Sequence, residues 1–149
     1  HIPFWIGGSS KSAIRRTAKY GTGWQAGQET AAELPPVLDA IKDAVAKAGR
    51  SIDADHYGAG FHFRFGGWDD ADLPKRTRAF EKRTGRDPKQ HFAVGDADAI
   101  LARIASYAEA GISKFILRPI GQSDSELMDQ TRQLIEEVIP KAVKLEAAA

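Results

Sequence analysis

The strongest constraint on the fold is a repeated alternation of short apolar or glycine-bounded segments with amphipathic segments. Phe61, Phe63 and Phe65 alternate with polar residues, which predicts a strand with one aromatic face. We expect strands over about residues 2–6, 23–27, 56–67 and 114–120, followed by helices over about 11–20, 30–48, 96–110 and 123–140. Such alternation predicts parallel strands joined by right-handed crossovers. Two α/β architectures fit: an open doubly wound sheet, or half of an eight-stranded barrel with four βα units.

The segment from about residue 67 to 91 does not follow this alternation. It lacks a strong apolar stripe, opens with a cluster of acids and continues with many basic residues. We expect a long excursion that contains a helix near 75–83 and a turn at 85–88. The acids Asp69, Asp70 and Asp72 are predicted to form a solvated loop rather than an acid–base pair, because nothing in the sequence fixes their separation.

Composition narrows the function classes. The chain has 149 residues and a net charge of +1, so we expect one domain, with neither nucleic acid nor a membrane as partner. The absence of cysteine excludes disulfides, thiolate metal sites and a cysteine nucleophile. The four histidines show no ligand spacing, which argues against a metal site, and no serine lies in a nucleophile elbow. No apolar run reaches the roughly 20 residues of a membrane span, and we expect a cytoplasmic protein.

The two ends of the sequence give the domain prediction. Residue 1 is a histidine directly before an apolar strand, so we expect the native start to lie upstream. Residues 1–143 are predicted to form the domain, and 144–149 to be a frayed helix end or a cloning remnant.

The first predicted strand ends in Gly7 and Gly8, followed by Ser9, Ser10 and a basic helical segment. Glycines let a backbone approach a ligand closely, serines cap helices, and the unpaired N–H groups of a first helical turn favour an anion such as phosphate. The same residues are also typical of a simple turn from a strand into a helix. An anion site and a plain turn therefore both stay open as interpretations at this point.

Several motifs, taken in order, resemble one known family. They are Pro3-Phe4-Trp5-Ile6-Gly7-Gly8-Ser9, Ala13-Ile14-Arg15-Arg16-Thr17-Ala18, Tyr20-Gly21-Thr22-Gly23-Trp24, the segment 92–101 and Ala110-Gly111-Ile112-Ser113-Lys114-Phe115-Ile116-Leu117-Arg118-Pro119. Together they resemble the luciferase-like monooxygenase family, the flavin- and deazaflavin-dependent oxidoreductases built on a (β/α)8 TIM barrel. The resemblance leaves out roughly residues 50–90.

The resemblance implies that the four predicted strands are the fifth to eighth of the barrel, its C-terminal half. The intact parent would then transfer a hydride or activate oxygen with FMN or the deazaflavin coenzyme F420, with a slight preference for the deazaflavin. The family's catalytic side chains in the first half of the barrel are absent, so this chain alone is expected to be inactive. Thr22 stands where the family usually has an aspartate, so a role tied to that carboxylate is not expected here.

The resemblance also names cofactor-binding candidates. Gly7, Gly8 and Ser9 would contact the phosphate of the cofactor, and Gly23 with Trp24 would border the same pocket. The alternative is that the glycines form a turn and that Trp24 belongs to the core.

Three further residues are candidates because active sites of barrels lie at the C-terminal ends of the strands. Arg118 ends the fourth predicted strand and would bind a phosphate or carboxylate, or else pair with a local acid. His62 and Arg64 share one face of the third strand and are substrate-side candidates, against a solvated face or an inter-strand ion pair.

Two functions therefore stand. The first is the C-terminal part of a flavin- or deazaflavin-dependent oxidoreductase that acts on a small-molecule substrate. The second is a non-catalytic half-barrel that self-assembles or binds a phosphate ligand. Both predict a partner, because half a barrel leaves two strand edges unpaired: either the missing N-terminal half or a second copy of the chain.

Overall fold

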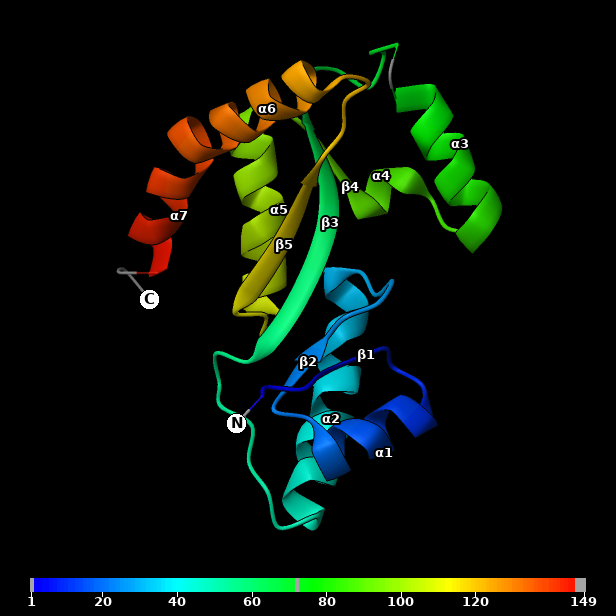
Figure 1. The fold of residues 1–149 in the computed structure, drawn as a ribbon, viewed down its shortest axis with the longest axis vertical. Coiled ribbons are helices and arrows are strands. Elements are labelled where there is room, and N and C mark those ends of the chain that lie inside the picture. The colour runs from blue at the N-terminus through cyan, green and yellow to red at the C-terminus, as the bar shows by residue number, and fades with distance from the viewer. Residues whose placement is uncertain (1, 72, 147–149) are drawn as a thin grey trace. The chain divides into compact units, whose positions relative to one another are not determined.

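The computed structural model describes residues 2–71 and 73–146, with side chains to residue 143 (Figure 1). The chain divides into two compact units, and each is described by itself. Unit 1 comprises residues 1–60 and 106–116, and unit 2 comprises residues 61–105 and 117–149. Among the described residues, no helix is both long and apolar enough to span a bilayer.

Unit 1 begins with two strand–helix pairs. Its elements are β1 (Trp5–Gly7), α1 (Lys11–Tyr20), β2 (Gly23–Gln25), the 3-10 turn η1 (Ala31–Glu33), α2 (Leu34–Lys47) and the start of β3 (Tyr57–Phe65). The strand β2 pairs in parallel with β1, opposite Trp5, and with β3, opposite Tyr57. Figure 1 shows α1 and α2 packed beside these strands.

The helices of unit 1 begin and pack as the sequence predicts. The Oγ of Ser10 accepts a hydrogen bond from the Ala13 N–H at the start of α1. Thr30 and Glu33, at the spacing of a capping box, form one before α2. The apolar stripe of α2 is buried at Leu34, Leu38, Ile41 and Val45, and Ala48 is exposed just beyond the last turn.

Unit 2 contains the rest of β3 and the C-terminal elements. These are α3 (Leu73–Thr84), α4 (Pro88–His91), β4 (Phe92–Gly95), α5 (Ala97–Glu109), β5 (Lys114–Pro119), α6 (Asp124–Gln133), the π-helical turn η2 (Leu134–Val138) and α7 (Ile139–Glu146); α5 and β5 also extend into unit 1. A buried cluster of Leu73, Phe80, Phe92 and Ile120 forms the core beside α3. The expected helix near 75–83 is therefore confirmed, and Phe80 attaches it to the core.

One strand differs from the sequence prediction. Phe92–Gly95 forms β4, which pairs in parallel with β3, so the hydrogen-bonded order is β1-β2-β3-β4 with β5 also on β3. We predicted four strands, because four residues are too short to show an alternating pattern. The expected turn at 85–88 is followed by the short helix α4, which Asp87 caps through the Lys89 N–H.

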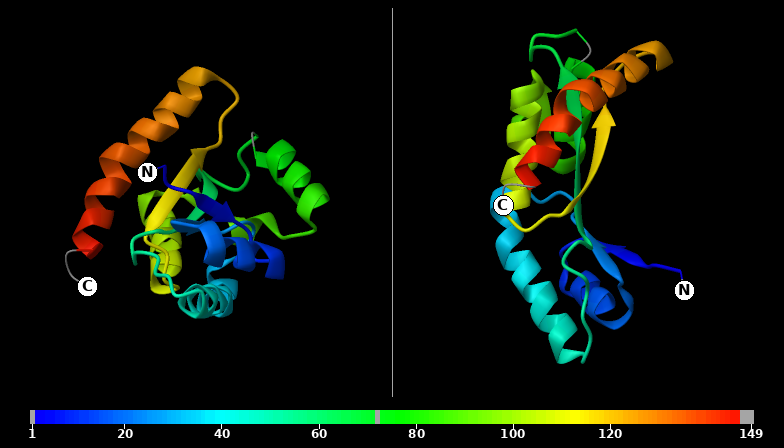
Figure 2. Two further views of the ribbon diagram at one scale, coloured as in Figure 1. Left: turned by 60° about the horizontal axis from the view of Figure 1, so that its bottom comes forward. Right: turned by 90° about the vertical axis from the view of Figure 1, so that its left-hand side faces the viewer.

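The last helix also differs, because we expected it to end near Pro140. Instead α6, the π turn and α7 form one continuous helix through that residue (Figure 2). Proline has no N–H to donate, and the wider π turn immediately before it changes the hydrogen-bond pairing, with the Ile139 N–H donating to the Leu134 carbonyl. The predicted class, α/β with parallel strands, is confirmed.

Candidate functional site

The loop between β1 and α1 is held by β2 at a single residue. Gly8 has φ +93°, a conformation that favours glycine. Its N–H donates to the Gln25 carbonyl at 3.2 Å, and its carbonyl accepts a hydrogen bond from the indole Nε1 of Trp24 at 2.9 Å. Both backbone groups of Gly8 are thus used to position the loop, and neither faces a ligand.

The N–H groups that could donate to an anion belong to residues that follow Gly8. Ser10, rather than Ser9, caps α1. Among the described residues, the amides of Lys11 and Ser12 have no acceptor within the protein. Because these amides lie in the first turn of a ten-residue helix, they suit an anion such as a phosphate.

Gly23 and Trp24 have clear packing roles in unit 1. Trp24 is fully buried, and a Cβ added to Gly23 would lie 2.5 Å from the ring of Trp5. Gly23 therefore makes room for Trp5, and Trp24 belongs to the core while its indole holds the loop at Gly8. Both residues therefore have structural contacts within unit 1, Gly23 with Trp5 and Trp24 with Gly8.

Arg64, in unit 2, is buried in an ion-pair network. Its Nε donates to Asp70 at 2.8 Å, one terminal nitrogen lies 2.6 Å from Glu126 Oε1, and the other donates to the Ile120 carbonyl at 2.8 Å. The side chain is only 8% exposed. Its guanidinium is thus bound within the protein, through ion pairs to a loop and to α6 rather than the inter-strand ion pair named above.

The same network corrects the prediction for the acids. Asp70 is not a solvated loop residue, because it is part-buried against Arg64. Asp69 is exposed as expected, and Asp72 lies outside the described residues. Glu126 lies far from Arg64 along the chain, and no local pattern in the loop indicates that Asp70, six residues away, turns back to Arg64.

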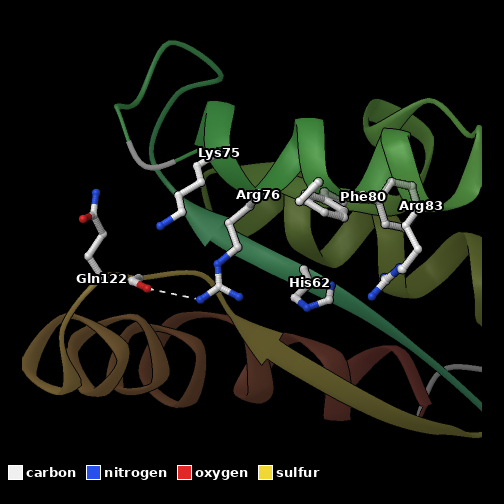
Figure 3. Close-up of a pocket in the computed structure, with 9 residues that line it drawn as sticks. His62, Lys75, Arg76, Phe80, Arg83 and Gln122 are labelled. Atoms are coloured by element: carbon white, nitrogen blue, oxygen red, sulfur yellow. Dashed lines mark hydrogen bonds between the residues drawn. The ribbon is translucent and has the colours of Figure 1, made fainter.

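His62 lies two residues before Arg64 but has a different environment. It lines a cavity of about 470 Å³ together with residues of α3, β4 and the segment after β5. In Figure 3 the side chains of Arg76 and Arg83 extend from α3 toward the strand that carries His62. Burial, and then the positive charges of Arg118, Arg76 and Arg83, lower the pKa of His62 below its usual value.

Arg118 is exposed near the end of β5, and its charge acts on His62. The cations of α3 were not predicted as site residues from the sequence. A signal was present: Arg76, Phe80 and Arg83 stand at i, i+4 and i+7, so they share one helical face, and the aromatic residue marks that face as core-directed.

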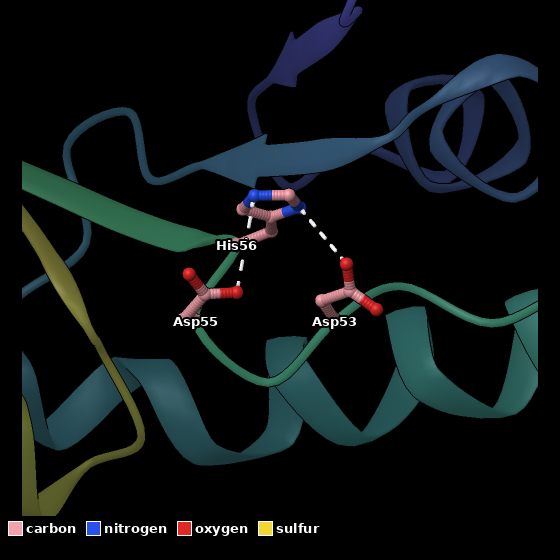
Figure 4. A group of neighbouring side chains, drawn as sticks. All are labelled: Asp53, Asp55 and His56. Atoms are coloured by element: carbon pink, nitrogen blue, oxygen red, sulfur yellow. Dashed lines mark ion pairs between the residues drawn. The ribbon is translucent and has the colours of Figure 1, made fainter.

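Unit 1 also brings together two acids and a histidine (Figure 4). Asp53 and Asp55 each lie 3.8 Å from the His56 ring. Asp55 also pairs with Lys114, whose hydrogen bond holds the pKa of that carboxyl below its usual value. The Nδ1 of His56 donates to the Thr22 carbonyl at 3.0 Å, so one of its nitrogens is already used. These contacts account for the cluster as ion pairs on an exposed loop.

No protein-family model and no curated protein matches the sequence. Solved structures do match. An F420-dependent secondary alcohol dehydrogenase, solved with an F420–acetone adduct, aligns with TM-score 0.69 and 17% identity over 95% of this chain and 49% of that chain. The coenzyme F420-dependent tetrahydromethanopterin reductase from Methanopyrus kandleri aligns with TM-score 0.65 and 15% identity over 94% and 51%. The oxygenating constituent of 3,6-diketocamphane monooxygenase from Pseudomonas putida, in complex with FMN, aligns with TM-score 0.67 and 13% identity over 92% and 47%.

The chain thus spans about half the length of the solved structures it matches. Nearly all of the chain takes part in each alignment, so the likeness includes the segment 50–90 that the motifs left out. The resemblance read from the sequence is confirmed at the level of the fold: this chain has the fold of about half of a flavin- or F420-dependent oxidoreductase, as expected for half of a (β/α)8 barrel.

Proposed function

We propose that the chain forms the C-terminal half of a flavin- or F420-dependent oxidoreductase whose intact form transfers a hydride or activates oxygen. One observation carries the proposal: nearly the whole chain has the fold of half of several proteins whose cofactors are F420 or FMN. Bound flavin or deazaflavin would supply the redox chemistry, and the chain's own residues would bind and orient it.

The β1–α1 loop is the part of unit 1 that fits the cofactor's phosphate. The amides of Lys11 and Ser12 would donate to the phosphate oxygens, and Gly7, Gly8 and Ser9 would bring the backbone close to it. Gly23 and Trp24 would support the loop through their contacts with Trp5 and Gly8, so their contribution to cofactor binding would be indirect.

A partner would complete the barrel. In unit 2, Met128, Ile135, Ile139 and Val143 form an exposed apolar stripe along α6, η2 and α7. Such a stripe favours burial by a further protein surface. We assign this surface to the N-terminal half-barrel, since the matched structures are about twice as long as this chain. Covering by a second copy is the alternative, and it would give the non-catalytic, self-assembling protein.

The cofactor proposal is tested by titrating FMN and F420 separately into the longest natural form of the protein. We expect saturable binding of one of them, and at least tenfold weaker binding after Gly8→Asp, which adds a carboxylate beside the phosphate position. Gly49→Asp is the matched control, because Gly49 also has a positive φ and has no atom within 4 Å of an added Cβ. Absence of saturable binding, or equal affinity of the Gly8 variant, would show that the loop is not a cofactor site.

The partner assignment has its own measurement. Sedimentation of this chain alone distinguishes a monomer from a dimer, and Ile135→Glu should change the result only if the stripe is an interface. A dimer that Ile135→Glu dissociates supports the self-assembling alternative. A monomer that binds a separately produced N-terminal half supports the half-barrel assignment, whereas failure to bind it contradicts that assignment.

A further inference from the structure

The cavity of unit 2 concentrates positive charge on one wall. Lys75, Arg76 and Arg83 line it from α3, and His62 lines it from β3 (Figure 3). The remaining lining residues are Ala79, Phe80, Phe92, Gly121 and Gln122. No acidic residue is among them, and Arg118 adds a fourth cation close enough to act on His62.

These cations are not neutralised by the protein as far as it is described. Among residues 2–71 and 73–143, Lys75, Arg83 and Arg118 have no ion-pair partner. Arg76 makes a long hydrogen bond of 3.5 Å to the Gly121 carbonyl, which is neutral. All four side chains are exposed, so water screens their mutual repulsion, but their shared positive potential attracts an anion to the cavity.

Two aromatic side chains, Phe80 from α3 and Phe92 from β4, add an apolar surface to the cavity. Phe80 and Phe92 pack edge to face with centroids 5.1 Å apart, and both line the cavity. The arrangement suits a small molecule with one strongly charged end and a less polar body. Arginine side chains favour phosphate and carboxylate oxygens because the planar guanidinium donates two parallel hydrogen bonds.

We propose that this pocket binds a phosphate monoester, held by Lys75, Arg76 and Arg83 and supported by Arg118. A dianion is favoured over a single carboxylate because three cations line the cavity and the charge of a fourth, Arg118, reaches His62. Binding of the dianion does not depend on the proposed oxidoreductase function. The further inference that the dianion is the charged group of the substrate rests on that function.

His62 provides an internal reporter. It faces Arg76 and Arg83 from α3, Arg118 from β5 and the ring of Phe92 from β4, with centroids 5.2 Å apart. Burial lowers the pKa of His62 below its usual value, and these cations, which no acid among these groups offsets, lower it further. A dianion bound beside it offsets part of this positive charge, and the pKa of His62 should then rise.

The first test titrates sulfate and inorganic phosphate into the full chain at constant ionic strength, with chloride as the reference salt. Sulfate keeps its two charges across the pH range of the experiment, whereas phosphate titrates. We expect saturable binding of both anions that Arg83→Gln and Lys75→Gln each weaken roughly three- to tenfold. Arg78→Gln and Lys82→Gln are matched controls, since both residues are exposed on α3 and neither lines the cavity.

Two outcomes overturn the proposal. Absence of saturable binding excludes the site, and equal weakening by the control variants shows only nonspecific attraction to a basic helix. The His62 resonances give a second measurement on the unaltered protein: the pKa of His62 should rise on saturation with sulfate and should stay unchanged in the chloride reference. An unchanged His62 pKa contradicts the assigned position of the anion.

A comparison of FMN with riboflavin identifies the source of the phosphate. If Arg83→Gln weakens FMN but not riboflavin, the pocket holds the cofactor's phosphate. If it weakens sulfate binding and leaves FMN unaffected, the pocket is separate from the cofactor and serves the substrate. A failure of FMN and F420 to bind at all, with sulfate binding intact, would reject the proposed function and leave the anion site standing.

Discussion

Replacing Arg64 tests whether this residue stabilises unit 2 or serves a ligand. Its guanidinium bonds to Asp70, Glu126 and the Ile120 carbonyl, and so joins β3 to the excursion loop, to α6 and to the segment after β5. Arg64→Met keeps the length and packing of the aliphatic part but removes all three bonds. Two carboxylates and one carbonyl then lose their bond to Arg64, while Glu126 keeps the hydrogen bond from the Gln122 N–H.

The expected cost follows from burial. Removing one member of a buried ion pair typically costs about 3–5 kcal/mol, because the other charge is left uncompensated. The side chains of Asp70 and Glu126 are 25% and 27% exposed, so hydration of their carboxylates offsets part of this free-energy cost. We therefore expect the lower end, about 3 kcal/mol, which corresponds to a decrease in Tm of roughly 6–12 °C for a chain of this size.

The assay is urea and thermal unfolding of the full chain, followed by circular dichroism. Arg118→Met is the control, since Arg118 is exposed; its effect should stay within about 0.5 kcal/mol. Adding Glu126→Gln to Arg64→Met should cost less than the two single changes summed, because both break the same pair. If Arg64→Met costs less than about 1 kcal/mol and instead abolishes ligand binding, Arg64 is a ligand residue and the network is incidental.

The remaining predictions concern positions with a defined local environment. Gly23→Ala should cost about 1–3 kcal/mol in unfolding free energy, since the added Cβ would lie 2.5 Å from the Trp5 ring; an unchanged denaturation midpoint would contradict the packing described. Trp24→Phe leaves the Gly8 carbonyl without its donor and should cost about 1–3 kcal/mol by urea unfolding, with no loss expected if that hydrogen bond is absent in solution. The folded pKa of His62 lies below its unfolded value of about 6.5, so stability is full above that pH and falls as the pH decreases through the folded pKa; His62→Gln should flatten this slope in unfolding measurements between about pH 5 and 7, and an identical slope would refute the shift.

The elements that the sequence predicted well are those whose signals are local. The stripe of α2 and the capping box at Thr30 and Glu33 involve residues within a few turns of one another, so periodicity and spacing are sufficient to find them. The strand β4 was missed because its pairing with β3 joins residues about thirty positions apart, from His62 with Phe92 to Phe65 with Gly95. Nothing within its four residues shows that pairing.

The candidate site shows the same limit more sharply. Alternation placed His62 and Arg64 on one face of a strand, and that placement alone gave both the same candidate role. Their chemistry differs because of distant partners: Asp70 and Glu126 neutralise Arg64, whereas cations without acids surround His62. The alternation along a strand shows which side chains share a face. Whether such a side chain can bind a ligand depends on the charges contributed by α3, α6 and the end of β5. The distinction is open to experiment, since an anion should shift the pKa of His62 while substitution of Arg64 should act chiefly on stability.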